Sequence, residues 1–215
     1  MAERGFRNPY PDYDVLAKWQ SPSWNEQTRE VVAKRLREVP PRRFLTEAQY
    51  ATLEAVCDRV MPQPERGLDK VPIAPWIDAR LHENRGSGTR YVPLPPLQDC
   101  WRRGLDAIEA EAQHRYRRSY HLLDQVEQDL ILQAMNKGET EGPAWGPHFP
   151  AQKFMRHELL QVIVEVYYAH PAAWSEIGFG GPASPRGYLR LAANRHDSWE
   201  AQERDDTLVR AAAFK

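Results

Sequence analysis

The sequence predicts an all-α protein with one helical domain of about six helices, long proline- and glycine-rich loops and an extended N-terminal arm. Apolar residues recur at spacings of three and four in several segments, which is typical of helices packed on one face. No segment alternates apolar and polar residues between hairpin turns, as a half-buried strand does. The 18 prolines and 12 glycines indicate long connections, because both residues interrupt helices.

Composition and charge argue against two classes of protein, nucleic-acid binders and membrane proteins. The chain has 215 residues and a formal net charge of -1, which argues against a strongly basic nucleic-acid binder. No stretch approaches the roughly 18 consecutive apolar residues that a membrane helix needs, so we expect no membrane insertion.

The first elements are an arm and a helix. Residues 1–22 mix prolines with aromatic side chains, which suits an extended arm packed on a surface better than a solvated linker. Ser23 and Glu26 then predict a capping box for a helix that ends before Pro40.

The clearest helix begins at Thr46, because Gln49 stands three residues later and completes a capping box. Leu53 and Val56 continue its apolar face, and Pro62 ends it. A short helix follows from about Pro75, a residue that suits the first helical turn.

Three helices are predicted in the second half of the chain. One begins at Leu97, and its basic end at 115–118 is either a solvated helix terminus or a phosphate-binding patch, of which we favour the first. The next runs from the cap at Asp124 to Lys137, before Gly138. The most apolar helix covers 151–169 and stops before Pro171.

Catalytic motifs are absent from the sequence. His157 lacks the second histidine of a zinc-peptidase helix, since position 161 is Gln, although His157, Gln161 and Glu165 share one helical face. The glycines at 178–181 follow a helix end, so a tight turn is favoured over a phosphate cradle. No nucleophile elbow and no dinucleotide fingerprint occur. We expect no catalytic, cofactor-binding or metal-binding residue in this chain.

Two features bear on the compartment. Arg42 and Arg43 begin a string like a twin-arginine export signal, but polar residues follow where an apolar stretch is needed, and 1–11 is polar. We therefore expect a cytoplasmic protein. The two cysteines are too few for a disulfide framework, and whether Cys57 and Cys100 pair stays open.

Two segments resemble the gluconate 2-dehydrogenase subunit 3 family, the small subunits of FAD-dependent sugar and polyol dehydrogenases. The first contains Phe44-Leu45-Thr46-Glu47-Ala48-Gln49-Tyr50, Asp58-Arg59-Val60-Met61-Pro62 and Val71-Pro72-Ile73-Ala74-Pro75-Trp76-Ile77-Asp78. The second is more specific and contains Tyr167-Tyr168-Ala169-His170-Pro171, Trp174, Glu176-Ile177-Gly178-Phe179-Gly180-Gly181-Pro182 and Pro185-Arg186-Gly187-Tyr188. The resemblance covers about 44–190.

This resemblance implies an accessory subunit that is not catalytic alone. Its partner would be a large flavoprotein subunit of the glucose-methanol-choline type, which binds FAD and oxidises the sugar or polyol. The small subunit would support folding and flavin loading, and electrons would pass through the partner to a cytochrome or a soluble acceptor. Exported members begin with a twin-arginine leader, whereas this chain has a polar and aromatic extension.

Aromatic side chains in proline-held loops are suited to an interface, because they offer large contact area at low entropic cost. We therefore expect an arm and first helix at 1–43 that wrap the partner, a subunit domain at 44–190 and a polar tail at 191–215. The alternative is that the 170–188 loop closes this chain's own core. The predicted interface residues are Tyr10, Tyr13, Trp19, Trp24, Trp145, His170, Pro171, Trp174, Phe179, Pro182, Arg186 and Tyr188.

Two other functions remain open at this stage. The chain could be an assembly chaperone that leaves once the flavoprotein is loaded. It could also be an enzyme in its own right, metal-dependent through His157 and Glu165.

Overall fold

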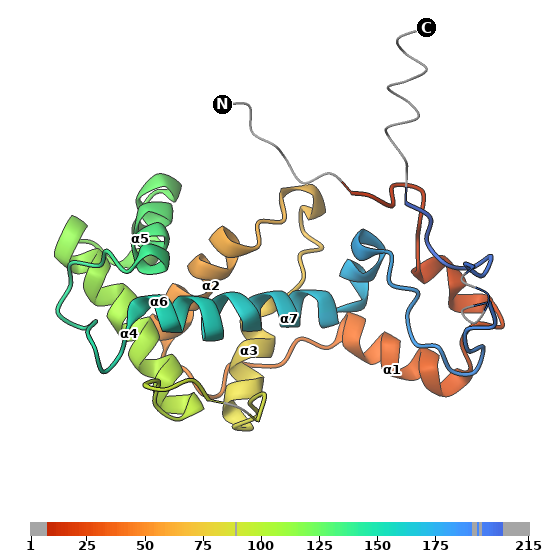
Figure 1. Ribbon diagram of the computed structural model, residues 1–215, viewed down its shortest axis with the longest axis horizontal. Coiled ribbons are helices and arrows are strands. Elements are labelled where there is room, and N and C mark those ends of the chain that lie inside the picture. The colour runs from red at the N-terminus through yellow and green to blue at the C-terminus, as the bar shows by residue number, and fades with distance from the viewer. Residues whose placement is uncertain (1–7, 89, 191–192, 194, 204–215) are drawn as a thin grey trace, which may run out of the picture. The chain divides into compact units, whose positions relative to one another are not determined.

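The structure, a computed structural model, describes residues 8–88, 90–190, 193 and 195–203. Helices dominate this part of the chain and no strand occurs in it, which confirms the all-α prediction (Figure 1). The α-helices are α1 (Glu26–Arg37), α2 (Glu47–Val60), α3 (Ile73–His82), α4 (Leu97–Tyr116), α5 (Gln125–Lys137), α6 (Ala151–Phe154) and α7 (Gln161–Ala169).

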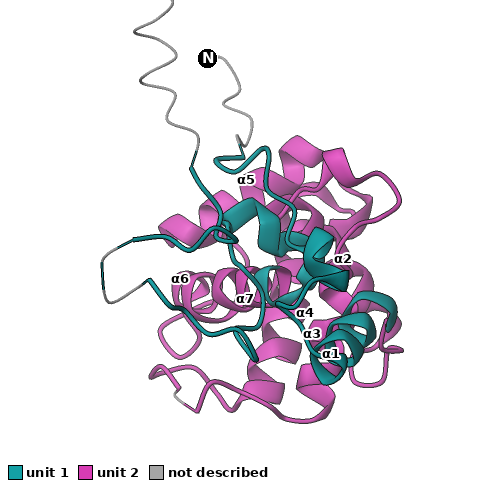
Figure 2. Cartoon of the chain, turned by 90° about the vertical axis from the view of Figure 1, so that its right-hand side faces the viewer, with its two compact units in different colours: residues 1–38, 168–215 teal, residues 39–167 magenta. Residues whose placement is uncertain are grey.

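The chain forms two compact units, coloured separately in Figure 2. Unit 1 combines 1–38 with 168–215, and unit 2 is 39–167. These divisions differ from the boundaries near 43 and 190 that we expected from the sequence. The physical reason lies in unit 1, where Trp24 from the N-terminal part packs in one buried cluster with Trp174 from the C-terminal part.

The helix starts follow the local sequence closely, with one exception. The capping boxes at Thr46 and at Asp124 are both present, so these two predictions are confirmed. The predicted cap at Ser23 is wrong, because α1 begins two residues later. Asn25 is its cap, and its side chain accepts a hydrogen bond from the backbone N–H of Thr28 at 2.9 Å.

The arm is less extended than expected. Leu16–Gln20 is a short 3₁₀ helix, and Val15 just before it is fully buried. Val15 packs with Trp24, Val32 and Trp174 in the core of unit 1.

In unit 2, α4 and α6 pack closely against each other. Gly104 of α4 faces Phe154, and a Cβ added at Gly104 would lie 2.1 Å from the tip of that ring. Phe154 is itself surrounded by rings, with centroids 5.7 to 6.2 Å away, from Trp101, Trp145 and Phe149. The glycine therefore allows an aromatic cluster to fill the space between the two helices.

The helix predicted over 151–169 is present as one continuous run, seen in teal in Figure 1. It is not a uniform α-helix: Met155–Leu160, between α6 and α7, is π-helical and is called η4 here. Segments of this kind often occur at functional sites.

Two further findings concern the cysteines and the lengths of the helices. Cys57 and Cys100 are free thiols and both are buried, so they do not pair. Among the residues described, no helix combines the length and the apolar character needed to cross a membrane.

Candidate functional site

A pocket of about 450 Å³ lies in unit 2, where α3, α4, η4 and α7 meet the loop at 84–97. Its volume is within the range of small-molecule sites in proteins. Its apolar lining includes side chains that are almost fully buried: Ile77, Leu81, Trp101 and Val162. Its charged lining consists of Arg80, Arg85, Arg90, Glu158 and Glu165, beside His157.

The end of α3 shapes one wall of the pocket. The N–H of Arg85 donates to the carbonyl of Arg80 at 2.9 Å, and the N–H of Asn84 donates to that of Leu81 at 2.9 Å. These two bonds form a Schellman motif, and Asn84 takes the left-handed conformation that it requires, with φ of 51°. The motif turns the chain sharply, so that Arg85 follows α3 into the pocket wall.

Arg80 is held in place from two sides. Its Nε donates to the carbonyl of Arg85 at 2.8 Å, and its Nη1 donates to Glu165 Oε2 at 2.9 Å. Gln161 Nε2 donates to the other oxygen of Glu165 at 2.9 Å. Partial burial pushes the pKa of Glu165 upward, but the hydrogen bonds from Gln161 and Arg80 outweigh it and lower this pKa below its ordinary value. Glu165 is therefore a fixed carboxylate at neutral pH.

Glu158 is the second carboxylate of the pocket and has no cationic partner of this kind. Its Oε2 accepts a hydrogen bond from Trp101 Nε1 at 3.1 Å, while Oε1 has no hydrogen bond to another described residue. Burial raises the pKa of Glu158 above its ordinary value, although the Trp101 hydrogen bond acts in the opposite direction. A donor on a ligand would thus find an acceptor that is already oriented.

An aromatic pair closes another side of the pocket. The rings of Tyr91 and His157 are stacked, with centroids 3.7 Å apart and planes 15° from parallel. Burial, together with the charges of Lys153 and Arg156, lowers the pKa of His157 below its ordinary value. The imidazole is therefore uncharged at neutral pH and presents a flat ring beside Tyr91.

The metal hypothesis finds no support in this part of the molecule. His157, Gln161 and Glu165 do line one pocket, as their spacing predicted. However, Glu165 is engaged by Arg80 and Gln161, and the described residues contain no group of three or more His, Cys, Asp or Glu side chains that could hold a metal ion.

The residues predicted to contact a partner fall into three groups by burial. Trp24, Trp174, His170 and Pro171 are buried within unit 1. Phe179 and Tyr188 are exposed at 41% and 43%. Those that are partly buried are Tyr10, Tyr13, Trp19, Trp145, Pro182 and Arg186. The interface assignment stays a prediction, and so does its alternative. The burial of His170, Pro171 and Trp174 is what the alternative expects, in which the 170–188 loop closes this chain's own core.

Two of these residues, Arg186 and Tyr188, meet in one cluster of unit 1. The guanidinium of Arg186 lies 3.5 Å from the ring centroid of Trp199 and donates from Nη2 to the carbonyl of Gly180 at 2.9 Å. Tyr188 also packs on Trp199, at 4.9 Å between centroids. Sequence reasoning missed Trp199, because it assigned the segment after 190 to a polar tail.

Sequence reasoning also missed two buried carboxylates that organise loops of unit 2. Asp78 accepts hydrogen bonds from three successive backbone N–H groups at 43–45. Glu111 is fully buried, pairs with Arg115 at 2.7 Å, and accepts from the N–H groups of Glu141 and Gly142. A charged residue on the apolar side of a predicted helix is the signal that could have found both.

The comparison with known families can now be added to this geometry. A family model described as Gluconate 2-dehydrogenase subunit 3 matches residues 47–181, which is more than half of the chain. The chain belongs to this family. No curated protein and no solved structure matches it. In this member of the gluconate 2-dehydrogenase subunit 3 family, the whole pocket lies inside the matched region, whereas Arg186 and Tyr188 lie beyond it.

Proposed function

We propose that this chain is the non-catalytic small subunit of a heteromeric FAD-dependent dehydrogenase of sugars or polyols. The large partner, of the glucose-methanol-choline type, would bind FAD and carry out the oxidation. This chain would support the folding, flavin loading and stability of that partner. The observation that carries the proposal is the family match, because the family's description names one subunit of a dehydrogenase and so implies a catalytic partner.

A candidate contact surface for the partner lies in the segment 177–189 of unit 1. Four large apolar side chains of this segment are exposed, and exposed apolar area of this kind occurs at interaction sites. They are Ile177 at 45%, Phe179 at 41%, Tyr188 at 43% and Leu189 at 83%. The buried tryptophans at 24 and 174 would support this surface from within rather than touch the partner.

Co-expression with the large flavoprotein subunit of the same host tests the proposal. We expect the two chains to co-elute in fixed stoichiometry, and we expect Phe179→Ser with Tyr188→Ser to reduce the complex yield at least about tenfold, as loss of central interface side chains does. Leu68→Ser, at a fully exposed position of unit 2, is the matched control. The melting temperature of each isolated variant shows whether it has remained folded.

The outcome also separates the two accessory roles. Fixed co-elution supports a permanent subunit, whereas a flavoprotein that gains FAD but elutes without this chain would identify a transient chaperone. If no flavoprotein co-purifies and its FAD content is independent of this chain, the proposal fails.

A further inference from the structure

The pocket in unit 2 contains charged groups of both signs around an apolar base. Arg80 and Glu165 neutralise each other at 2.9 Å, so a ligand gains little net attraction from either. Two charged groups remain without such a close partner. Glu158 has one oxygen open, and Arg90 is exposed and has no ion pair to another described residue.

The hydrogen-bonding capacities of Glu158 and Arg90 limit the chemistry of a ligand. A carboxylate such as Glu158 accepts hydrogen bonds only, and an arginine such as Arg90 donates only. Gln161 can do either. A hydroxyl group both donates and accepts, so a row of hydroxyls can satisfy all three side chains without adding charge next to the Arg80–Glu165 pair.

The remaining walls suit the carbon backbone of such a ligand. Ile77, Leu81 and Trp101 offer apolar surface, and the stacked rings of Tyr91 and His157 offer a flat one. Arg85 and Arg90 add two cations from the loop. The guanidinium of Arg85 forms an ion pair with Glu83 at 3.4 Å, and 74% of the Arg85 side chain is exposed. A ligand carboxylate would pair with these arginines bidentately.

We propose that this pocket binds a small polyhydroxylated carboxylate, with its hydroxyls on Glu158 and Gln161 and its carboxylate on the arginines of the loop. All the residues that line the pocket belong to this chain. The small subunit would therefore sense the hydroxy acids on which a dehydrogenase of this kind acts or which it forms.

The test uses the full 215-residue chain without a partner, so it stands apart from the test of the proposed function. D-gluconate is the probe, measured by titration calorimetry and by the shift in melting temperature. Sorbitol supplies the hydroxyls without the carboxylate, and hexanoate supplies the carboxylate without the hydroxyls. We expect saturable binding of gluconate and at least about tenfold weaker binding of the other two.

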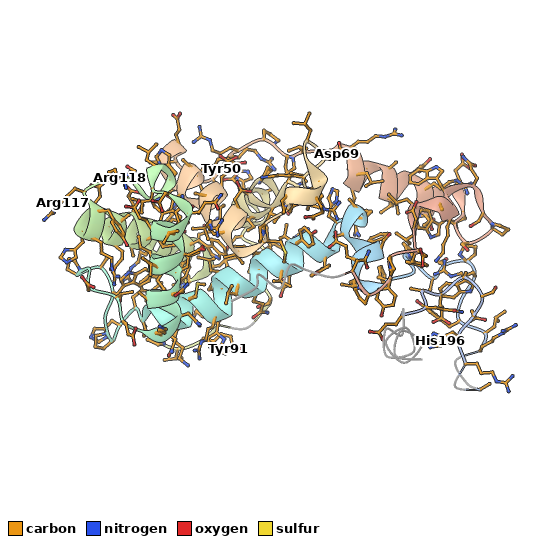
Figure 3. All side chains as sticks on the ribbon, turned by 90° about the horizontal axis from the view of Figure 1, so that it is seen from above. Tyr50, Asp69, Tyr91, Arg117, Arg118 and His196 are labelled. Carbon is orange, nitrogen blue, oxygen red and sulfur yellow. The ribbon has the colours of Figure 1, made fainter. Side chains whose placement is uncertain are left out.

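Two variants locate the site. Glu158→Gln keeps an oxygen for Trp101 Nε1 but removes the charge. Arg90→Gln removes an exposed cation that has no ion pair with another described residue. Each is expected to weaken gluconate binding about tenfold, the usual size of one charge-assisted hydrogen bond. Arg117→Gln is the control, because this exposed arginine lies at the far end of α4, well separated from Tyr91 in Figure 3.

Several outcomes would contradict the proposed binding site. Equal binding of gluconate and hexanoate would reduce the site to general anion attraction, and equal binding of sorbitol would remove the carboxylate from recognition. No binding at all, or the same loss in Arg117→Gln as in Glu158→Gln, would also overturn the proposal. So would pocket variants whose only effect is to reduce co-purification with the flavoprotein, since the pocket would then be a protein interface.

Discussion

At the scale of the residue, Asp78 is the side chain whose loss we expect to lower the free energy of unfolding most. It is fully buried in α3, and its carboxylate accepts the backbone N–H groups of Arg43 at 2.6 Å, Phe44 at 3.2 Å and Leu45 at 2.8 Å. These donors belong to the segment that leads into α2. The carboxylate thus connects the start of one helix to the middle of another, and no ion pair joins it to a cation of the described residues.

We predict that Asp78→Asn lowers the free energy of unfolding by about 2 to 3 kcal/mol, because an amide supplies one acceptor oxygen and turns an N–H₂ donor toward buried donors. Urea denaturation at pH 7 measures this. Asp69→Asn is the control, since Asp69 is exposed on a loop of the same unit (Figure 3). A loss no larger than that of the control would mean that Asp78 does not hold the segment.

The difference between what could and could not be read from the sequence is clear at this scale. The caps at Thr46 and Asp124 were predictable because each makes its bonds within three residues. Asp78 binds groups 33 to 35 residues away, and no local pattern contains that distance. Glu158 and Arg80 were missed as pocket residues for the same reason, since their partners, Trp101 and Glu165, lie on other helices.

At the scale of the element, the approach of α4 to α6 depends on the absence of a side chain at Gly104. We predict that Gly104→Ala lowers the free energy of unfolding by about 1 to 3 kcal/mol, because its methyl group would overlap the ring of Phe154. This sign is opposite to the gain of about 0.5 to 1 kcal/mol that alanine brings to an unobstructed helix.

A double-mutant cycle with Phe154→Leu checks the cause. If the clash is responsible, the double variant should lose clearly less than the sum of the two single variants, as measured by chemical denaturation. Additive losses, or a more stable Gly104→Ala protein, would contradict this explanation of the close packing.

The helices themselves were largely predictable, because apolar spacing and caps are local features. The π-helical segment η4 was not predictable, because the extra residue in its turn leaves no signature in the apolar spacing. The face shared by His157, Gln161 and Glu165 was still correctly predicted. The pocket that this face lines was not predicted, because its opposite wall comes from α3, α4 and the 84–97 loop.

At the scale of the whole molecule, thiol and tyrosine groups whose pKa is raised by burial make the protein less stable at alkaline pH. Burial raises the pKa of the Cys57 thiol above its ordinary value, raises that of Cys100 to about 12 and raises that of Tyr50 to about 12. The folded chain therefore holds protons that the unfolded chain releases from about pH 9 for thiols. Stability is fully present below that pH and falls above it, by up to about 1.4 kcal/mol per pH unit for each of the two buried thiols.

We predict that the free energy of unfolding declines from about pH 9 and that Cys57→Ala with Cys100→Ala moves the onset toward pH 10, where tyrosines begin to ionise. Urea denaturation between pH 7 and pH 11 measures the slope, whatever the baseline loss of the variant. Lys18 acts in the opposite direction, because burial lowers its pKa to about 8 and the unfolded chain then holds the extra proton up to about pH 10.5. An unchanged onset in the double variant would exclude the thiols as the cause.

The division of the chain into units was the least predictable feature at this scale. The family resemblance correctly indicated the region 47–181, but motifs along a chain do not reveal which distant segments share a core. Unit 1 combines the two ends of the chain because Val15, Trp24 and Val32 from the first part pack in one buried cluster with Trp174 from the second.

The composition of unit 1 also has a consequence for biosynthesis. Trp24 leaves the ribosome early, but its partner Trp174 follows only after about 150 further residues have been added, which takes roughly 8 to 30 s at ordinary translation rates. During that interval unit 2 is already emerging, while the N-terminal rings are still uncovered. The nascent chain therefore completes its earliest-made segment last, and this delay is when it is most open to capture by another protein.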